Sequence, residues 1–166
     1  MSRRLAAVLL GVVGAACANH AIEEGDAAGS APGDHAPDTL RGVVAITGAD
    51  PLTQVVLRPA GGAPVTLTGP IADSLRGAVG LVVVVAGRRD GSALEPRTFR
   101  VAGLDDLPAA DGRLEIEAGA AILVTADGER LRYPGAPEAL RRLAGRHVWI
   151  AGEPGREPQQ WGVLAP

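Results

Sequence analysis

The sequence contains no lysine, a single cysteine and very few aromatic residues. All sixteen basic residues of the 166-residue chain are arginines, set against nineteen acidic residues, and the formal charge is -3. A general nucleic-acid binder gains affinity by neutralising phosphates with surplus basic residues, which this balance lacks. A phosphate loop of the P-loop type is excluded because its lysine is missing. We therefore predict that nucleic acid is not a partner.

The rest of the composition favours a small β-rich globular protein. Hydrophobic residues make up 46%, which is too many for a disordered chain, and the 23 glycines and 13 prolines are too many for an all-helical one. We predict an all-β fold with short helices.

The first sixteen residues have the pattern of a secretory signal. Arg3 and Arg4 precede an unbroken run of twelve apolar residues or glycines, Leu5 to Ala16, which ends in small residues. As a helix this run would rise only about 18 Å, short of the roughly 20 residues that cross a bilayer. We predict that residues 1 to 16 are a cleaved signal peptide.

The only cysteine follows this run directly. Gly14-Ala15-Ala16-Cys17 resembles the lipobox of bacterial lipoproteins, in which the cysteine is acylated and becomes the mature first residue. The family usually has leucine where Gly14 stands, so ordinary signal-peptidase cleavage near Ala16 is the alternative. The resemblance implies a membrane partner through a lipid on Cys17. It also implies an outer-membrane location facing the periplasm, because Ala18 stands where the family's retention signal is aspartate.

Residues 17 to 38 are rich in alanine, glycine, proline and acidic residues and hold one large apolar residue, Ile22. Such a segment cannot build a core, and we predict a flexible tether. It contains a cluster of side chains that could hold a divalent ion loosely, although a solvated spacer is the favoured interpretation: His20, Glu23, Glu24, Asp26, Asp34 and His35.

The remaining residues, 39 to 166, align with themselves. The alignment has an offset of 65 over Val83-Val148 and Val85-Ile150, of 62 at Phe99-Trp161 and of 70 at Gly42-Gly112. Repeats indicate one unit used twice. We predict a first module at 39 to 104, a connector at 105 to 111 and a second module at 112 to 166.

Each module is predicted to have the order β-β-β-α-β-β, from period-two alternation, turn residues and helix-end signals. Strands are expected at 42–46, 54–57, 64–68, 81–86 and 97–101, with a helix at 71–76, and again at 114–117, 121–125, 130–133, 147–151 and 160–164, with a helix at 138–144. This order resembles the oligonucleotide/oligosaccharide-binding (OB) fold, a five-stranded, partly open barrel. One continuous β-sandwich is the alternative. Units this small are marginally stable alone, so we expect the two modules to pack together.

Candidate catalytic groups are scarce in this part of the sequence. Ser74 and Ser92 lack a nucleophile-elbow motif, and His147, the only histidine beyond the tether, precedes an apolar strand. Asp105-Asp106 lacks the acidic repeat of a calcium loop, and no cluster has metal-ligand spacing. Asp111-Gly112 is typical of a turn. We therefore expect no cofactor, no metal and no enzymatic activity.

A ligand-binding face is also poorly equipped. Phe99 and Trp161 hold equivalent places in the last strands and are expected to pack rather than to stack on bases or sugars. Arg88 and Arg89, expected in the loop between the fourth and fifth strands of the first module, are candidate contacts for an anion or a lipid head group.

These observations favour a non-enzymatic, lipid-anchored envelope protein that acts as a binding or structural assembly module for an unknown envelope protein or small ligand. One alternative is a periplasmic small-molecule carrier, which needs a sizeable apolar cavity. Another is a hydrolytic enzyme with a site where the modules meet, around Asp105, Asp106 and His147.

Overall fold

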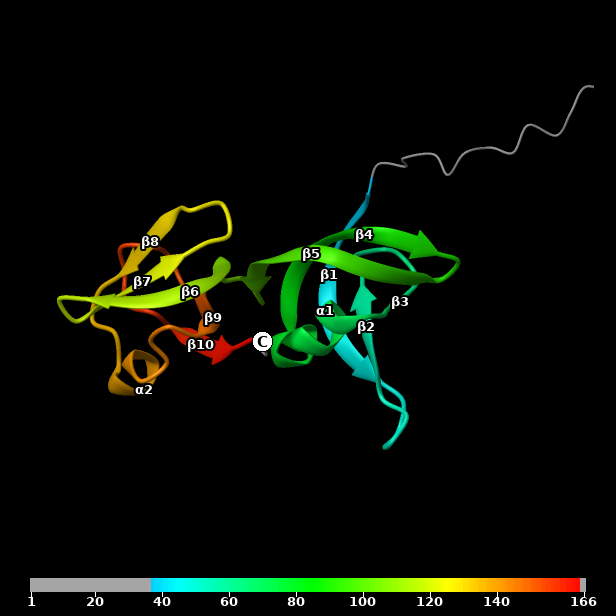
Figure 1. The fold of residues 1–166 in the computed structure, drawn as a ribbon, viewed down its shortest axis with the longest axis horizontal. Helices are drawn as coiled ribbons and strands as arrows, with labels where there is room; N and C mark the ends of the chain where they lie inside the picture. The colour runs from blue at the N-terminus through cyan, green and yellow to red at the C-terminus, as the bar shows by residue number, and fades with distance from the viewer. Residues whose placement is uncertain (1–36, 165–166) are drawn as a thin grey trace, which may run out of the picture. The chain divides into compact units, whose positions relative to one another are not determined.

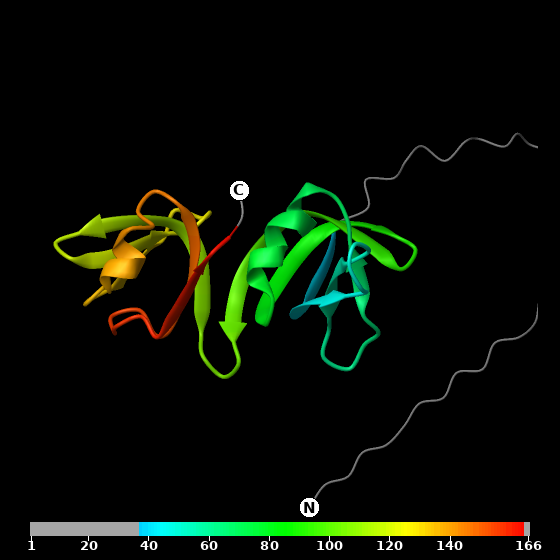
Figure 2. The ribbon, with the colours of Figure 1, turned by 90° about the horizontal axis from the view of Figure 1, so that it is seen from below.

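The computed structural model describes residues 37–164, which belong to one compact unit. In this part of the chain the fold is mostly β, with two five-stranded sheets and a few short helices (Figures 1 and 2). The all-β prediction is confirmed. The predicted signal peptide, Cys17 and all but the last two residues of the predicted tether lie outside the described residues.

The first sheet contains the strands β1 to β5 in the order β1-β2-β3-β5-β4, and β4 returns to pair with β1. All its pairs are antiparallel except β3 with β5, which is parallel. The helices α1 and η1, a 3-10 turn, lie between β3 and β4. The elements are β1 Asp38–Thr47, β2 Gln54–Arg58, β3 Val65–Leu67, α1 Pro70–Ser74, η1 Leu75–Ala78, β4 Leu81–Asp90 and β5 Ala93–Leu104.

The second sheet is entirely antiparallel and has the order β10-β9-β6-β7-β8. Its single helix again lies between the third and fourth strands. The elements are β6 Ala109–Glu117, β7 Ala120–Val124, β8 Arg130–Tyr133, α2 Glu138–Arg141, β9 His147–Ala151 and β10 Gln160–Val163. The predicted bounds of β8 and β9 are confirmed to the residue.

Strand registers place the predicted repeat pairs at equivalent positions. Gly42 lies opposite Val83 in the first sheet, and Gly112 lies opposite Val148 in the second. Across the last two strands of each sheet, the equivalent cross-strand pairs are Val85 with Phe99 and Ile150 with Trp161. The residue pairs aligned by the repeat in the sequence therefore have matching cross-strand neighbours in the two sheets.

Each sheet encloses its own cluster of buried apolar side chains. The first cluster is built on residues such as Leu57, Leu75 and Val83, and the second on Leu114, Leu123 and Ile150. Buried positions alternate along β4, at Leu81, Val83 and Val85, as in a half-buried strand, whereas β7 is buried at four consecutive residues, Ala120 to Leu123.

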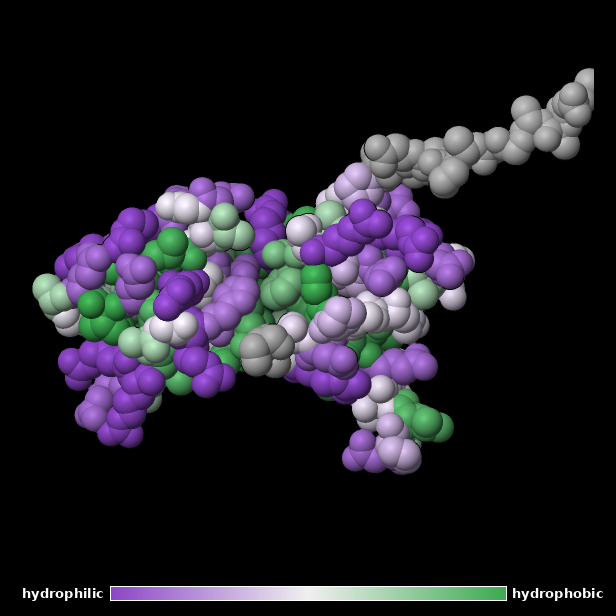
Figure 3. Space-filling model, viewed as in Figure 1, coloured by the Kyte–Doolittle hydropathy of each residue, from purple (hydrophilic) through white to green (hydrophobic). Residues whose placement is uncertain are grey.

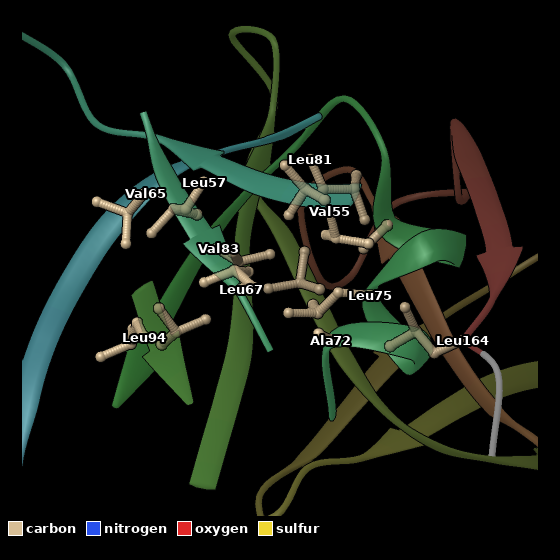
Figure 4. Close-up of a cluster of buried hydrophobic side chains, with 14 residues drawn as sticks. Val55, Leu57, Val65, Leu67, Ala72, Leu75, Leu81, Val83, Leu94 and Leu164 are labelled. Carbon is tan, nitrogen blue, oxygen red and sulfur yellow. The ribbon is translucent and has the colours of Figure 1, made fainter. Parts of the chain in front are cut away.

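Leu164, which follows β10 of the second sheet, is 1% exposed and belongs to the first cluster. Figure 4 shows it beside Ala72 and Leu75. The end of the second sheet thus contributes to the core of the first.

Several boundaries differ from those expected. β4 and β5 continue beyond the core as a hairpin, in which Arg88 pairs in register with Glu95, so Arg88 and Arg89 lie in a strand and not in a loop. β6 begins at Ala109, inside the segment predicted as a connector. The predicted turn at Asp111-Gly112 is therefore part of β6. In both places a polar residue lies in a paired strand, because a residue of a neighbouring strand interacts with its side chain: Glu95 with Arg88, and His147 with Asp111.

The helix of the second sheet is also shorter than predicted. α2 ends at Arg141, and hydrogen-bonded turns continue to Gly145, whose φ of 82° is the left-handed conformation expected of a helix-terminating glycine.

Candidate functional site

Asp111 joins the two sheets through both of its carboxylate oxygens. Its Oδ1 accepts a hydrogen bond from the backbone N–H of Val101 in β5, at 2.6 Å, and its Oδ2 lies 2.8 Å from Nε2 of His147 in β9. The Asp111 side chain is 10% exposed and that of His147 is 45% exposed. A carboxylate this buried needs such partners, because burial without them costs several kcal/mol.

The ring of His147 also contacts the first sheet. It stacks on Phe99 of β5 with ring centroids 6.2 Å apart and an interplanar angle of 26°. Phe99 in turn packs against the first hydrophobic cluster. Asp111, His147 and Phe99 therefore form one contact that links β6 and β9 to β5.

An acid–histidine pair is also part of hydrolytic sites, where the histidine must reach a nucleophile. Here the partners of His147 are Asp111 and Phe99. Asp105 and Asp106, the acids expected beside His147, are exposed residues of the tight turn that joins β5 to β6, and the side chain of neither makes a hydrogen bond or ion pair within residues 37–164. Ser74 lies in α1, and Ser92 lies exposed at the tip of the β4–β5 hairpin.

Trp149 makes a second link between the sheets. It lies in β9, beside the inward-facing Val148 and Ile150, and packs against the first hydrophobic cluster. Its indole N–H is buried and has no hydrogen-bond partner among the described residues. Gly162 on β10 leaves room for the ring, because a Cβ there would lie 2.6 Å from the indole nitrogen.

Asp111 and Trp149 were not identified as junction residues from the sequence. The available signal was the repeat itself: at the aligned places the first module has Arg41 and Val84, so the second module replaces an arginine by an acid and a valine by tryptophan. Both changes occur at outward positions of their strands. Such positions face either solvent or a neighbouring element.

A separate hollow of about 250 Å³ lies between the β2–β3 edge and α1. Val55, Leu67 and Ala72 supply its apolar lining. Polar side chains, among them Thr53 and Arg76, supply the rest. Arg76 is held by an ion pair with Asp73 at 3.4 Å and by Nη1 and Nη2 contacts to the hydroxyl and carbonyl of Thr53, each 3.3 Å.

The two arginines expected to meet an anion make local contacts. Arg88 forms an exposed ion pair with Glu95 at 3.5 Å, and Arg89 donates from Nε to the carbonyl of Gly91 at 3.3 Å. Exposed pairs of this kind contribute at most about 1 kcal/mol, so they leave both side chains free to exchange partners.

Phe99 and Trp161 are both half-buried, and each packs against the cluster of its own sheet. Tyr133 is the most fully buried aromatic of the chain. Burial, with a smaller contribution from Glu129, raises the pKa of its phenol from 10.0 to about 12. Tyr133 is therefore a neutral core residue.

Within residues 37–164 no group of three or more histidine, cysteine, aspartate or glutamate side chains is placed to hold a metal ion. No helix in the same range is both long and apolar enough to cross a bilayer. Searches of protein-family models, curated proteins and solved structures returned no match to this chain.

Proposed function

We propose that the two sheets are tandem OB-like barrels. The first sheet has the strand order 1-2-3-5-4 with a return to strand 1, and the second has the order 5-4-1-2-3, which is the same succession without the pairing of strands 3 and 5. A helix between the third and fourth strands in each sheet, and the matched registers, support the same assignment.

The chain acts in this proposal as a non-enzymatic binding or assembly module. The observation that carries it is the use of Asp111: the acid that reaches His147 in the described part of the chain also accepts a hydrogen bond from the Val101 amide, so the pair holds β5 against β6 and β9. This use leaves the outer surface of the first sheet for a partner, which would be an envelope protein or a small ligand.

The proposed site of action is the periplasmic face of the outer membrane, with the chain anchored through Cys17. This location depends on the lipobox-like sequence. It is compatible with the start of β1 at Asp38, which is the last residue of the predicted tether, residues 17 to 38. At about 5 to 6 Å times the square root of its length, such a tether holds the modules roughly 25 Å from the bilayer.

Two alternatives remain open to the same test. A small-molecule carrier would use the hollow beside α1. The volume of this hollow, about 250 Å³, is smaller than that of a typical ligand pocket, and its lining is partly polar where such pockets are mostly apolar. A hydrolase would use His147 with a nucleophile, and the partners of His147 within residues 37–164 are the Asp111 carboxylate and the Phe99 ring, with no hydroxyl among them.

The proposal is tested in cells that express the full chain, with photo-crosslinking groups placed on the first sheet at Thr39 or Thr47, both exposed. We expect specific crosslinked adducts that persist in His147→Ala at a temperature where this variant remains folded. Adducts that vanish in Cys17→Ala would assign the role to the anchored form. Absence of any adduct, together with hydrolytic activity that His147→Ala removes, would establish the enzyme alternative.

The anchor itself is tested by mass spectrometry of the chain extracted from membranes. We expect a mature first residue Cys17 carrying acyl groups. A mature chain that begins elsewhere, or an unmodified thiol, would contradict lipidation.

A further inference from the structure

The outward surface of the first sheet differs from its counterpart in the second sheet at three matched positions. In the second sheet, Asp111, Trp149 and Gly162 lie side by side across β6, β9 and β10. Asp111 and Trp149 contact the first sheet and its core. This surface of the second sheet is thus occupied by the rest of the protein.

The same three places in the first sheet are filled by Arg41, Val84 and Arg100, which lie side by side across β1, β4 and β5. Both arginines are exposed and Val84 is half-buried. The next row of the sheet consists of Arg58, Val43 and Val82. We call these six residues the arginine face.

No carboxylate lies opposite any arginine of this face, because the cross-strand partner of Arg41 and Arg100 is Val84 and that of Arg58 is Val43. The side chains of these three arginines form no ion pair or hydrogen bond among the described residues. This contrasts with Arg76, Arg88, Arg130, Arg142 and Arg156, each of which has an acidic partner.

The aliphatic part of the face is also accessible. Val43 is 39% exposed, and Val82 and Val84 are half-buried. Figure 3 shows hydrophobic surface over the strands of the first sheet, bordered by hydrophilic side chains. The face therefore combines three unpaired cations with short branched aliphatic side chains and has no aromatic residue.

From this combination we infer that the arginine face docks on a membrane surface that contains anionic phospholipid. This inference rests on the proposed function, in which the chain is anchored to the membrane by a lipid. Arginine forks bind phosphate through paired N–H donors, and the three positive charges complement a negatively charged leaflet. Single-stranded nucleic acid would need stacking aromatics, and protein hot spots are enriched in Trp, Tyr and Arg. The six side chains include no aromatic residue, so only the arginines would be available to such partners.

The charges are sufficient to orient an anchored module but not to recruit a free one. Each basic residue near an anionic leaflet strengthens association about fivefold, so three of them give roughly a hundredfold. Stable attachment generally requires two signals, for example a lipid and a basic patch. β1, which carries Arg41 and Val43, is also the strand that begins directly after the predicted tether.

The test uses the full chain, extracted with its lipid and inserted into vesicles, with an environment-sensitive fluorophore on Thr98→Cys. Thr98 is exposed on β5 two residues before Arg100, so the label shares the arginine face. We expect the fluorescence of the label to report a membrane-proximal position in vesicles of phosphatidylethanolamine and phosphatidylglycerol. The fluorescence change should be weaker in vesicles of phosphatidylethanolamine and phosphatidylcholine, and high salt should remove the difference between the two lipid mixtures.

R41A/R58A/R100A is expected to abolish the difference. The matched control is R132A/R141A/R146A, which removes the same charge from exposed arginines that have no ion-pair partner among the described residues and should leave the signal intact. Arg132 lies in β8, Arg141 in α2 and Arg146 just before β9. R41K/R58K/R100K guards against misfolding, since it preserves charge and should retain most of the signal. Equal signals in the two lipid mixtures, or equal losses in the two alanine variants, would overturn the inference.

A separate measurement tests the lipid anchor. If the extracted chain does not float with vesicles of phosphatidylethanolamine and phosphatidylcholine, it carries no lipid, and the proposed anchoring is contradicted. The Cys17→Ala chain, titrated at high lipid concentration, should bind anionic vesicles only weakly, roughly a hundredfold better than neutral ones, and R41A/R58A/R100A should remove that difference. A label that responds to no vesicle but is protected by an envelope protein would overturn the membrane assignment in favour of a protein partner.

Discussion

Gly42 and Gly112 occupy the same place in the two sheets and are required there for the same reason. Each lies in the first strand, opposite a buried valine of the fourth. A Cβ on Gly42 would lie 2.6 Å from the carbonyl oxygen of Arg58 in the second strand, and one on Gly112 would lie 2.3 Å from that of Val124. The close approach of two backbones excludes any side chain at both places.

Gly42→Ala and Gly112→Ala are therefore expected to destabilise the protein, each by about 2 to 4 kcal/mol, because the colliding atoms belong to the backbone. Chemical denaturation measures the loss. Gly62→Ala is the control: its Cβ would meet only Pro59 at 3.5 Å, and the change should stay within about 0.5 kcal/mol. A neutral result at both strand positions would contradict the shared close approach.

Leu164→Ala tests the contribution of the second sheet's end to the first core. Leu164 is 1% exposed, and truncating a fully buried leucine costs about 2 to 5 kcal/mol. Val163→Ala, one residue earlier and half-buried against the second cluster, should cost less. Denaturation followed separately by the fluorescence of Trp149 and Trp161, both in the second sheet, and by proteolysis of β1 would show the two sheets unfolding together in the wild type. An unaffected stability in Leu164→Ala would remove this link.

Asp111→Ala should cost about 1 to 3 kcal/mol, because it leaves the Val101 amide and the His147 ring without their acceptor. Asp111→Asn should cost less, since its amide oxygen can still accept from Val101. Asp106→Ala, in the exposed turn, serves as the comparison and should be neutral. If all three variants have the wild-type midpoint of unfolding, Asp111 does not hold the sheets together.

Stability should fall as the pH rises above 10 because of Tyr133. Its pKa is about 12 in the folded protein against 10.0 when exposed, so the unfolded chain releases the proton first. The stabilisation is complete below pH 10 and is lost towards pH 12, with a slope approaching about 1.4 kcal/mol per pH unit.

The sequence makes this measurement unusually clean. The chain has one tyrosine and no lysine, so Tyr133 is the only side chain expected to ionise in that range. Tyr133→Phe should show a flat stability over the same interval, and tyrosinate absorbance should appear near pH 12 in the folded wild type. A folded protein whose tyrosine titrates near pH 10 would refute the assignment.

Local patterns in the sequence determined the elements of the fold. Arg130–Tyr133 and His147–Ala151 were predicted to the residue because alternation and flanking turn residues act within a few positions of the chain. The repeat offsets determined equivalence as well, since Phe99 and Trp161 share a register. The strand pattern and the repeat offsets both depend only on spacing along the chain, so they can be read before the fold is known.

Tertiary structure alone decided which outward residues meet. Asp111 and His147 are 36 residues apart, and the sequence pattern of Asp111-Gly112 is equally that of a turn. Arg88 and Arg89 resemble a solvated loop until Glu95 pairs with Arg88 across the hairpin. The hydrophobic pattern around Leu164 would be the same whether this side chain were buried in the core of its own sheet or in that of the other. Hydrophobic alternation specifies that a side chain is buried, whereas the partner depends on long-range packing, which no local pattern encodes.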